Sequence, residues 1–420
     1  MTPERGATYY DRQEVRPPAE RERSMLNALQ GLIRHAVDNA PHLTRHLAGV
    51  DPDAVTSRAA LARLPVLRKS DLPGLQRERP PFGGLTATPL KRLAHVYASP
   101  GPIYDPEGAR ADYWRFARAM YAAGFRPGEV VHNTFSYHLT PAGMMAEGGA
   151  RALGCPVVPG GTGQTELQLR AIADIRPAAY VGTPSFLLIL LEKGRELGLD
   201  TSSITKALVS GEAFLPAARD RLAADGIGAY QCYATADLGL IAYETEARAG
   251  LVADEALIVE IVRPGTGEPV PDGEVGEVVV TAFNPDYPLI RFATGDLSAV
   301  LPGESPCGRT NLRIKGWMGR ADQSAKVRGM FVHPAQVHDA VRRHAPPLTG
   351  RARLVVSGAD GRDEMRLRCE MAESGDHAGL AEALADTVRG LTGLRAEVEL
   401  VAPGSLPNDG KVIDDQRARP

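Results

Sequence analysis

The stretch ELQLRAIADIRPAAYVGTPS, residues 166–185, decides the fold class, because a helical pattern passes directly into a strand pattern. Its first half is amphipathic, and its second half is a short apolar run that ends in small residues. The same alternation recurs over residues 92–300, where the apolar runs include GEVVHNTFS, GCPVVPG and ITKALVSG. Such alternation predicts an α/β fold with a mostly parallel sheet.

Different patterns flank this region. The first 90 residues are predicted to form a helical segment with an apolar face that includes Met25 and Leu29. From residue 257, ALIVEIVRPGTGEPVPDGEVGEVVVTAF contains two β-rich runs around a turn region, which predicts a β-rich subdomain.

The last hundred residues predict a separate module. RLVVSG, MRLRCEMAE, LAEALADTVRGLTG and RAEVELVAPGSLP follow the order β-β-α-β of a small α+β domain. The segment GWMGRADQS is the most favourable place for the boundary, because an apolar strand gives way there to glycine and charge. We therefore predict a large N-terminal domain, residues 1–318, and a small mobile domain, residues 319–420.

Composition excludes several classes of function. The chain has 420 residues and a formal net charge of −3, so neither nucleic acid nor an anionic membrane is an expected partner. Its N-terminus lacks the apolar core of a signal peptide, and no apolar run is long enough to span a membrane. We expect a cytoplasmic protein.

The cysteines argue against a metal or disulfide framework. Cys155, Cys232, Cys307 and Cys369 are scattered along the chain and show no C-x-x-C spacing. We expect no zinc site.

Three separated stretches contain acidic or basic residues suited to nucleotide chemistry. Asp237 in CYATADLGL could hold Mg²⁺ against phosphate oxygens from the end of a parallel strand, although Asp is also a common helix N-cap. Asp296 in LIRFATGDLSAV could accept both ribose hydroxyls from a Thr-Gly-Asp turn, or the segment could be a plain β-turn. Lys411 in PGSLPNDGKVIDDQ could place a charge on an oxyanion, or be a solvated lysine.

Taken in order, these segments resemble phenylacetate-CoA ligase and its relatives, a branch of the adenylate-forming acyl-CoA synthetases. The resemblance runs from about residue 8 to about residue 415. Its most specific part is CGRTNLRIKGWMGRADQSAKVRGMFVHPAQV, residues 307–337. The other segments that carry it are PVLRKSDL, GGTGQTELQLRAIADIRPAAYVGTPSFLL, SGEAF, CYATADLG, GEPVPDGEVGEVVVTAF, LIRFATGDLSAVLPG and PGSLPNDGKVIDD.

In that family a carboxylic acid reacts with Mg-ATP to give an acyl-adenylate and pyrophosphate, and the thiol of CoA then displaces AMP. The resemblance implies ATP/AMP, Mg²⁺ and CoA as cofactors and an aromatic or small carboxylic acid as the substrate. A carrier-protein thiol could replace CoA, and a homodimer is a further implication.

The resemblance also implies roles for individual residues. Lys411 would reach the carboxylate and the α-phosphate, Arg320 would pair with ribose or phosphate, and Asp322 would be the hinge of the small domain. Nucleotide contacts are implied for Gly211, Glu212 and Ala213 beside the adenine, Tyr233 on the base, Thr235 at the phosphate, Asp237 in place of the family's Mg²⁺-associated glutamate, and Asp296 at the ribose. The implied acid pocket contains Tyr137, His138, Gly182, Thr183, Pro184 and Ser185.

One segment departs from the family. YASPGPIYDPEG, residues 97–108, stands where relatives have a Ser/Thr/Gly-rich phosphate loop that ends in Lys-Pro. Ser99 and the N–H of Gly101 are the candidate phosphate donors, whereas Asp105 and Glu107 would add negative charge beside an anionic leaving group. Two functions therefore stay open: an acid-CoA ligase, or a relative that binds AMP, acyl-adenylate or acyl-CoA without efficient ATP chemistry.

Overall fold

The computed structural model of the chain describes residues 8–99, 102–321, 325–327, 330–359, 362–373 and 379–417. Its contacts divide it into two compact units. Unit 1 comprises Met1–Val259, Val280–Phe292 and Leu301–Trp317, and unit 2 comprises Glu260–Val279, Ala293–Val300 and Met318–Pro420. The domain boundary expected at residue 318 stays a prediction.

Unit 1 begins with short helices around one long helix, α1, which spans Pro18–Asn39. Proline occupies the first turn of α1, where a missing N–H costs nothing. Met25 and Leu29 are buried, as the apolar face predicts. The neighbouring elements are η1 (Arg12–Val15), α2 (Pro41–His46), η2 (Pro52–Ala54), α3 (Arg58–Leu61), η3 (Lys69–Asp71), α4 (Leu72–Glu78) and η4 (Leu90–Arg92).

Strands of the central sheet follow in the order β14-β15-β10-β9-β8-β7-β6-β4-β5. Neighbouring strands from β5 to β8 are parallel, whereas β8, β9, β10 and β15 pair antiparallel. The strands are β4 (Val131–Asn133), β5 (Val157–Pro159), β6 (Ala179–Gly182), β7 (Lys206–Val209), β8 (Gly228–Thr235), β9 (Gly239–Glu244), β10 (Leu251–Ala253), β14 (Val300–Leu301) and β15 (Arg313–Ile314).

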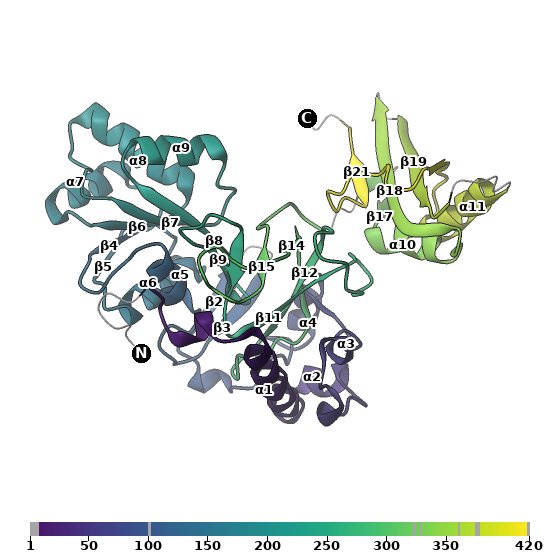
Figure 1. Cartoon of the computed structure of the whole chain (residues 1–420), viewed down its shortest axis with the longest axis horizontal. Helices are drawn as coiled ribbons and strands as arrows, with labels where there is room; N and C mark the ends of the chain where they lie inside the picture. The colour runs from purple at the N-terminus through teal and green to yellow at the C-terminus, as the bar shows by residue number, and fades with distance from the viewer. Residues whose placement is uncertain are drawn as a thin grey trace. The chain divides into compact units, whose positions relative to one another are not determined.

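Helices cover both faces of the parallel strands (Figure 1). Tyr180 and Val209 point to the face covered by three helices, whereas Val181 and Leu208 point to the other face, as the strand period of two requires. The first face carries α7 (Thr165–Ile175), α8 (Pro184–Leu197) and α9 (Pro216–Ala224), and the second carries α5 (Phe116–Ala122) and α6 (Ala142–Ala152).

A smaller sheet has the order β1-β13-β12-β11, and the residues of β11, β12 and β13 are divided between the two units. The segment that departs from the family forms a separate antiparallel hairpin, β2–β3. The bounds are β1 (Leu67–Arg68), β2 (His95–Ser99), β3 (Ile103–Glu107), β11 (Leu257–Val262), β12 (Gly276–Ala282) and β13 (Phe292–Ser298).

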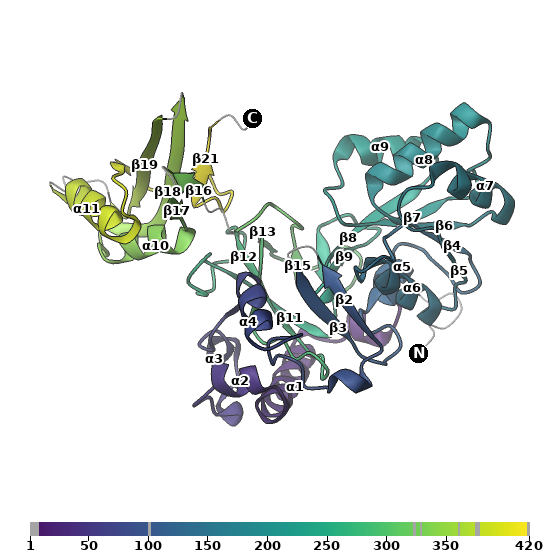
Figure 2. The ribbon, with the colours of Figure 1, turned by 180° about the vertical axis from the view of Figure 1, so that it is seen from behind.

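The C-terminal part of unit 2 is an α+β module, drawn in yellow-green in Figure 2. Its sheet has the order β20-β19-β18-β21, and Leu354, Leu367 and Leu384 belong to its core. The predicted fold class, a large α/β part with a small α+β module, is confirmed. The elements are β16 (Ala325–Val327), β17 (Met330–Val332), α10 (Pro334–Arg342), β18 (Leu348–Ala359), β19 (Arg362–Met371), α11 (Leu380–Thr392), β20 (Glu397–Val401) and β21 (Ile413–Asp415).

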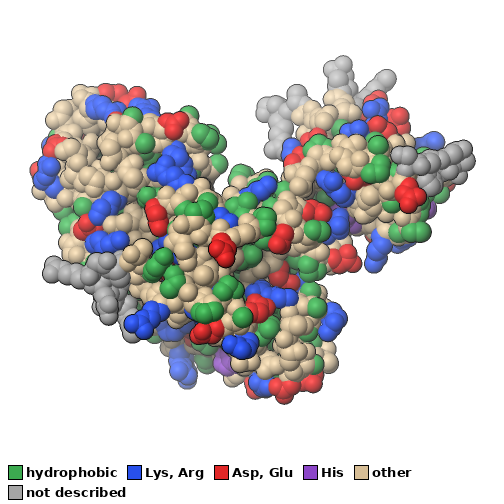
Figure 3. Space-filling model, viewed as in Figure 1, with side chains coloured by type: hydrophobic (Ala, Val, Ile, Leu, Met, Phe, Trp, Pro, Cys, Tyr) green, Lys and Arg blue, Asp and Glu red, His purple; other side chains and the backbone are tan. Residues whose placement is uncertain are grey.

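Acidic and basic side chains are interspersed on the face shown in Figure 3, in keeping with the net charge of −3. Among the described helices, none combines the length and apolar character needed to cross a membrane. All four cysteines are free thiols, and three of them are buried.

Candidate active site

Two loops of the predicted site meet at the carboxyl edge of the parallel strands. Gly182 ends β6 and residues 183–185 follow it, whereas SGEAF follows the neighbouring strand β7. Glu212 Oε1 accepts a hydrogen bond of 2.7 Å from the backbone N–H of Ser185. Ligands bind at this edge in open α/β sheets. The structure therefore brings the predicted adenine loop and the predicted acid loop together.

Position 182 must be glycine because neighbouring side chains leave no space for a Cβ atom there. A Cβ atom at Gly182 would lie 1.9 Å from Thr134 Oγ1 and 2.4 Å from the Tyr180 hydroxyl oxygen. Those two hydroxyls are hydrogen-bonded at 2.7 Å, and Tyr180 donates to the carbonyl of Thr183 at 3.0 Å. Thr183 Oγ1 in turn accepts from the N–H of Phe186 and caps α8. The loop is thus held by a buried hydroxyl pair.

Tyr137 is fixed at one wall of the predicted acid pocket. Asn133 Nδ2 donates to its hydroxyl oxygen at 2.7 Å, and burial together with Glu147 raises the pKa of the phenol. His138, by contrast, is exposed, and its backbone N–H donates to Ser136 Oγ at 3.1 Å. A role for His138 in narrowing the pocket stays a prediction.

The strand end that carries Thr235 and Asp237 turns directly into another strand. β8 ends at Thr235, residues 236–238 form a turn, and β9 begins at Gly239. Thr235 Oγ1 accepts from the N–H of Leu238 at 3.2 Å. The alternative role of Asp237 as a helix N-cap is therefore wrong. Tyr233, predicted to stack on the base, is buried in β8.

Asp237 lies in a buried cluster with a lysine from a distant segment. Lys69 Nζ, in η3, is 2.6 Å from Asp237 Oδ2, and the side chain of Asp237 is fully buried. Asp105 of β3 is also fully buried, and Ser99 Oγ donates to its Oδ2 at 2.8 Å. Burial, and next the charge of Asp237, raise the pKa of Asp105. Asp237 therefore pairs directly with Lys69, and the charge of Lys69 partly offsets the rise in the pKa of Asp105.

This arrangement corrects the expectation that Asp105 adds negative charge beside the leaving phosphates, whereas the same expectation for Glu107 stays a prediction. Asp105 points into the protein interior, where its protonated form is favoured. Glu107 accepts a hydrogen bond from the hydroxyl of Tyr97, and its Oε2 is 2.9 Å from His95 Nδ1. Pro100 and Gly101 lie outside the described residues, so the predicted role of Gly101 stays a prediction.

Asp296 and Arg320 are brought together within unit 2. Arg320 Nη1 donates to Asp296 Oδ1 at 3.1 Å, and their backbones form an isolated β-bridge. The Thr-Gly-Asp segment is not a turn, because it lies inside β13. Gly295 has φ = +76°, and a Cβ atom there would lie 2.8 Å from Arg320 Nη2. Glycine therefore leaves room for the guanidinium group.

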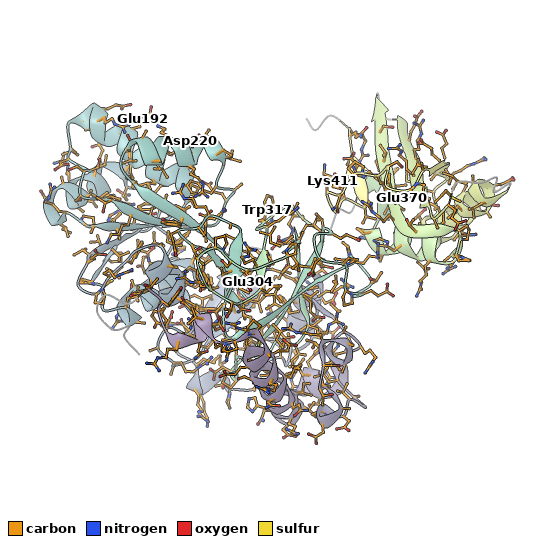
Figure 4. The ribbon with its side chains drawn as sticks, in the orientation of Figure 1. Glu192, Asp220, Glu304, Trp317, Glu370 and Lys411 are labelled. Carbon is orange, nitrogen blue, oxygen red and sulfur yellow. The ribbon has the colours of Figure 1, made fainter. Side chains whose placement is uncertain are left out.

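Lys411 lies in the turn that leads into β21, as Figure 4 shows. Its side chain is 51% exposed, and its Nζ is 3.6 Å from Asp414 Oδ1. Gly410, before it, has φ = +69°, a conformation that favours glycine. Asp322, the predicted hinge, lies outside the described residues.

Two family models match the chain. The AMP-binding enzyme model matches residues 110–283, and the AMP-binding enzyme C-terminal domain matches residues 329–417. A phenylacetate-coenzyme A ligase from Thermus thermophilus is 32% identical over 93% of this chain and 94% of its own length. One from Aromatoleum evansii is 33% identical over 91% and 90%. The chain belongs to the phenylacetate-CoA ligase family.

Solved structures agree with this assignment to the phenylacetate-CoA ligase family. A 2-hydroxyisobutyryl-CoA ligase in complex with R3-HIB-AMP has a TM-score of 0.74 and 30% identity, and the match covers 99% of this chain and 94% of that one. The same ligase in complex with 2-HIB-AMP and CoA has a TM-score of 0.72. The family predicted from the sequence is therefore confirmed.

For a phenylacetate-CoA ligase relative, Lys69 is the residue that the sequence analysis missed. It belongs to PVLRKSDL, a segment that carries the resemblance to the family but contains no local sign of a site residue. Nothing local signals its function, because its partner Asp237 is 168 residues away. Lys69 supplies positive charge beneath the hairpin, whose own sequence contains no lysine.

In this family, Mg²⁺ is expected to bind in the active site together with ATP. One oxygen of Asp237 is held by Lys69, and the whole side chain is buried. Asp237 therefore presents no exposed oxygen to the ion in this structure, and we assign it no step. Across the described residues, no group of three or more His, Cys, Asp or Glu side chains is placed to hold a metal.

We expect Asp105→Asn to stabilise the protein at high pH. The raised pKa of Asp105 means that the folded state binds a proton that the unfolded state has lost above about pH 4. Stability therefore falls as pH rises from there toward the folded pKa. Asparagine is uncharged, so the gain should be at least about 1 kcal/mol at pH 8, roughly the value of one pKa unit, and near zero at pH 4.

Urea unfolding of both proteins at several pH values measures this difference. Asp53→Asn, at an exposed position, is the control and should show no comparable gain. A loss of stability at pH 8 in Asp105→Asn would contradict the protonated state proposed for Asp105.

Proposed function

We propose that the protein is an AMP-forming acid-CoA ligase that activates an aromatic or small carboxylic acid with ATP and transfers the acyl group to CoA. The observation that carries this proposal is the match to a 2-hydroxyisobutyryl-CoA ligase over 99% of the chain, whose structures contain an acyl-AMP and CoA. ATP/AMP and CoA are the cofactors that follow, with Mg²⁺ as a further expectation.

The residues have separable roles in this proposal. Glu212 holds the loop of Ser185 against the adenine side of the site. Asp296 accepts the ribose hydroxyls, and Arg320 beside it meets the negative charge of the phosphate. Lys411 is the mobile cation that stabilises charge on the α-phosphate during adenylation.

The alternative, a relative without efficient ATP chemistry, depended on the hairpin. Its support came from Asp105 and Glu107, which were expected to repel the β- and γ-phosphates. Asp105 is fully buried and its raised pKa favours the uncharged form, so the repulsion expected from Asp105 loses its basis. Lys69 adds a cation nearby, which favours the ligase.

Calorimetric titration with Mg-ATP and with AMP, beside pyrophosphate release over a panel of carboxylic acids, tests the proposal. The ligase predicts ATP binding and pyrophosphate release that depends on the acid. AMP binding without ATP binding, and without pyrophosphate, would support the alternative function instead.

We expect Glu212→Ala to raise the KM for the acid about ten-fold. The variant loses the acceptor for the Ser185 N–H, a charge-assisted bond worth about 1.4 kcal/mol or more. Glu212→Gln retains an acceptor oxygen and should stay within about three-fold of wild type. Glu192→Ala, which removes an exposed side chain of α8 (Figure 4), is the control. An unchanged KM in Glu212→Ala would show that the loop does not depend on this bond.

Three finer features belong to the same proposal. CoA is the acceptor that the solved ligase supports, and a carrier-protein thiol is tested by thioester formation with either thiol. A homodimer is tested by light scattering of the purified chain. A cytoplasmic location fits a CoA-dependent reaction and is tested by cell fractionation.

A further inference from the structure

A cavity of about 50 Å³ in unit 2 is surrounded by basic side chains. This is room for more than one water molecule. Arg263 follows β11, His338 lies on α10, Arg351 and Arg353 lie on β18, and Lys411 precedes β21. Among the described residues that line the cavity, Glu274 alone is acidic.

Two buried nitrogen atoms at this cavity lack partners. His338 Nε2 and Arg353 Nε have no hydrogen-bond partner in the described part of the chain, and both residues are at least nine-tenths buried. Burial, and next the charge of Arg263, lower the pKa of His338 to about 4. Arg353 Nε can only donate, and an unsatisfied buried donor is costly, so a ligand that brings acceptor oxygens would be favoured here.

The acidic neighbours of these cations leave donor capacity unused. The distances of three ion pairs are 3.5–3.7 Å, longer than the 2.7–2.9 Å of strong charge-assisted bonds. These three pairs are Arg263 with Glu274, Arg351 with Glu370 (labelled in Figure 4), and Lys411 with Asp414. Arg353, in contrast, is in close contact with Asp409 through its Nη2.

We propose that this cavity binds a phosphate group. Cations converge on it from several directions, which suits a tetrahedral oxyanion with several acceptor oxygens, and guanidinium forks match phosphate geometry. The choice of ligand rests on the proposed function, because that reaction releases pyrophosphate and consumes CoA, which carries a 3′-phosphate. The bound group is either a free phosphate or pyrophosphate, or a phosphate of CoA.

Occupancy would also restrain the turn that carries Lys411. Asn408 Oδ1 accepts from the N–H of Val275 at 3.2 Å, and its Nδ2 donates to the carbonyl of Gly273 at 3.3 Å. A phosphate group held by both Arg263 and Lys411 would strengthen this contact. It would keep Lys411 from adenylation while bound, so we expect inorganic phosphate to slow pyrophosphate release.

Calorimetric titration of the full chain tests the site with four probes: inorganic phosphate, pyrophosphate, CoA and 3′-dephospho-CoA. Arg353→Gln removes a buried donor, and Arg263→Gln removes a partly exposed cation whose loss is less disruptive to folding. Arg366→Gln on β19, whose exposed side chain pairs with Glu397, is the control for net charge. We expect both cavity variants to weaken binding at least about ten-fold and the control to leave it unchanged.

The pattern of probes identifies the source. If the cavity variants bind phosphate and pyrophosphate more weakly than wild type does, the site binds free anions. If the variants lose affinity for CoA but not for 3′-dephospho-CoA, the site binds the 3′-phosphate of CoA. If Arg263→Gln and Arg353→Gln bind all four probes like wild type, the proposal is wrong. Acid-dependent pyrophosphate release by wild type is measured separately, so failure of this inference leaves the proposed function standing.

Discussion

Lys411→Ala is expected to reduce acid-dependent pyrophosphate release about 100-fold or more, while thioester formation from supplied acyl-adenylate stays within about two-fold of wild type. Removing one preorganised group that stabilises transition-state charge costs about this much. The side chain of Lys411 suits the role, because it is half exposed and its ion pair with Asp414 is 3.6 Å long. The loose pair holds the lysine weakly and leaves it available for the phosphate.

The comparison of the two half-reactions separates catalysis from folding. A misfolded variant would lose both activities, whereas loss of adenylation alone assigns Lys411 to that step. Lys193→Ala removes an exposed lysine of α8 that pairs with Glu196, and it should leave both rates unchanged. Wild-type pyrophosphate release in Lys411→Ala would remove Lys411 from the mechanism.

The fold was predictable because its signals are local. The period of two in β6 places Tyr180 and Val181 on opposite faces, and each face is covered by helices whose own apolar stripes are readable in the sequence. The C-terminal order β-β-α-β was readable for the same reason. A helix or strand whose apolar residues recur with a clear period can be predicted without knowing which distant segments it packs against.

Parts of the site were misread where a local rule competes with tertiary structure. Gly295 and Asp296 are typical turn residues, yet they lie inside β13, where the missing Cβ of Gly295 leaves space for Arg320. Asp105 occupies a buried position of β3, and no composition rule places a carboxyl group there. The neighbours of its carboxyl group include Ser99 and Asp237, and only the folded chain brings these residues together.

Lys69→Met is expected to lower the free energy of unfolding by about 3 kcal/mol at pH 8. The substitution leaves the buried carboxylate of Asp237 without its cation, and removing one partner of a buried pair typically costs about 3–5 kcal/mol. Lys69 is partly exposed, with 24% of its side chain accessible, so the lower end of that range applies. Lys91→Met, at an exposed lysine of η4, is the control and should change stability little.

The pH dependence distinguishes this electrostatic cost from lost packing. Without Lys69, Asp105 and Asp237 face each other with no cation between them, and the pKa of Asp105, already raised by burial and by Asp237, should rise further. Proton uptake relieves the repulsion, so the deficit of Lys69→Met should shrink between pH 8 and pH 5. Adding Asp237→Asn should restore most of the stability at pH 8, because the buried carboxylate that lost its cation is then gone. An equal deficit at both pH values, with no rescue by Asp237→Asn, would mean that Lys69 acts through packing and that the hairpin lacks the cation we assign to it.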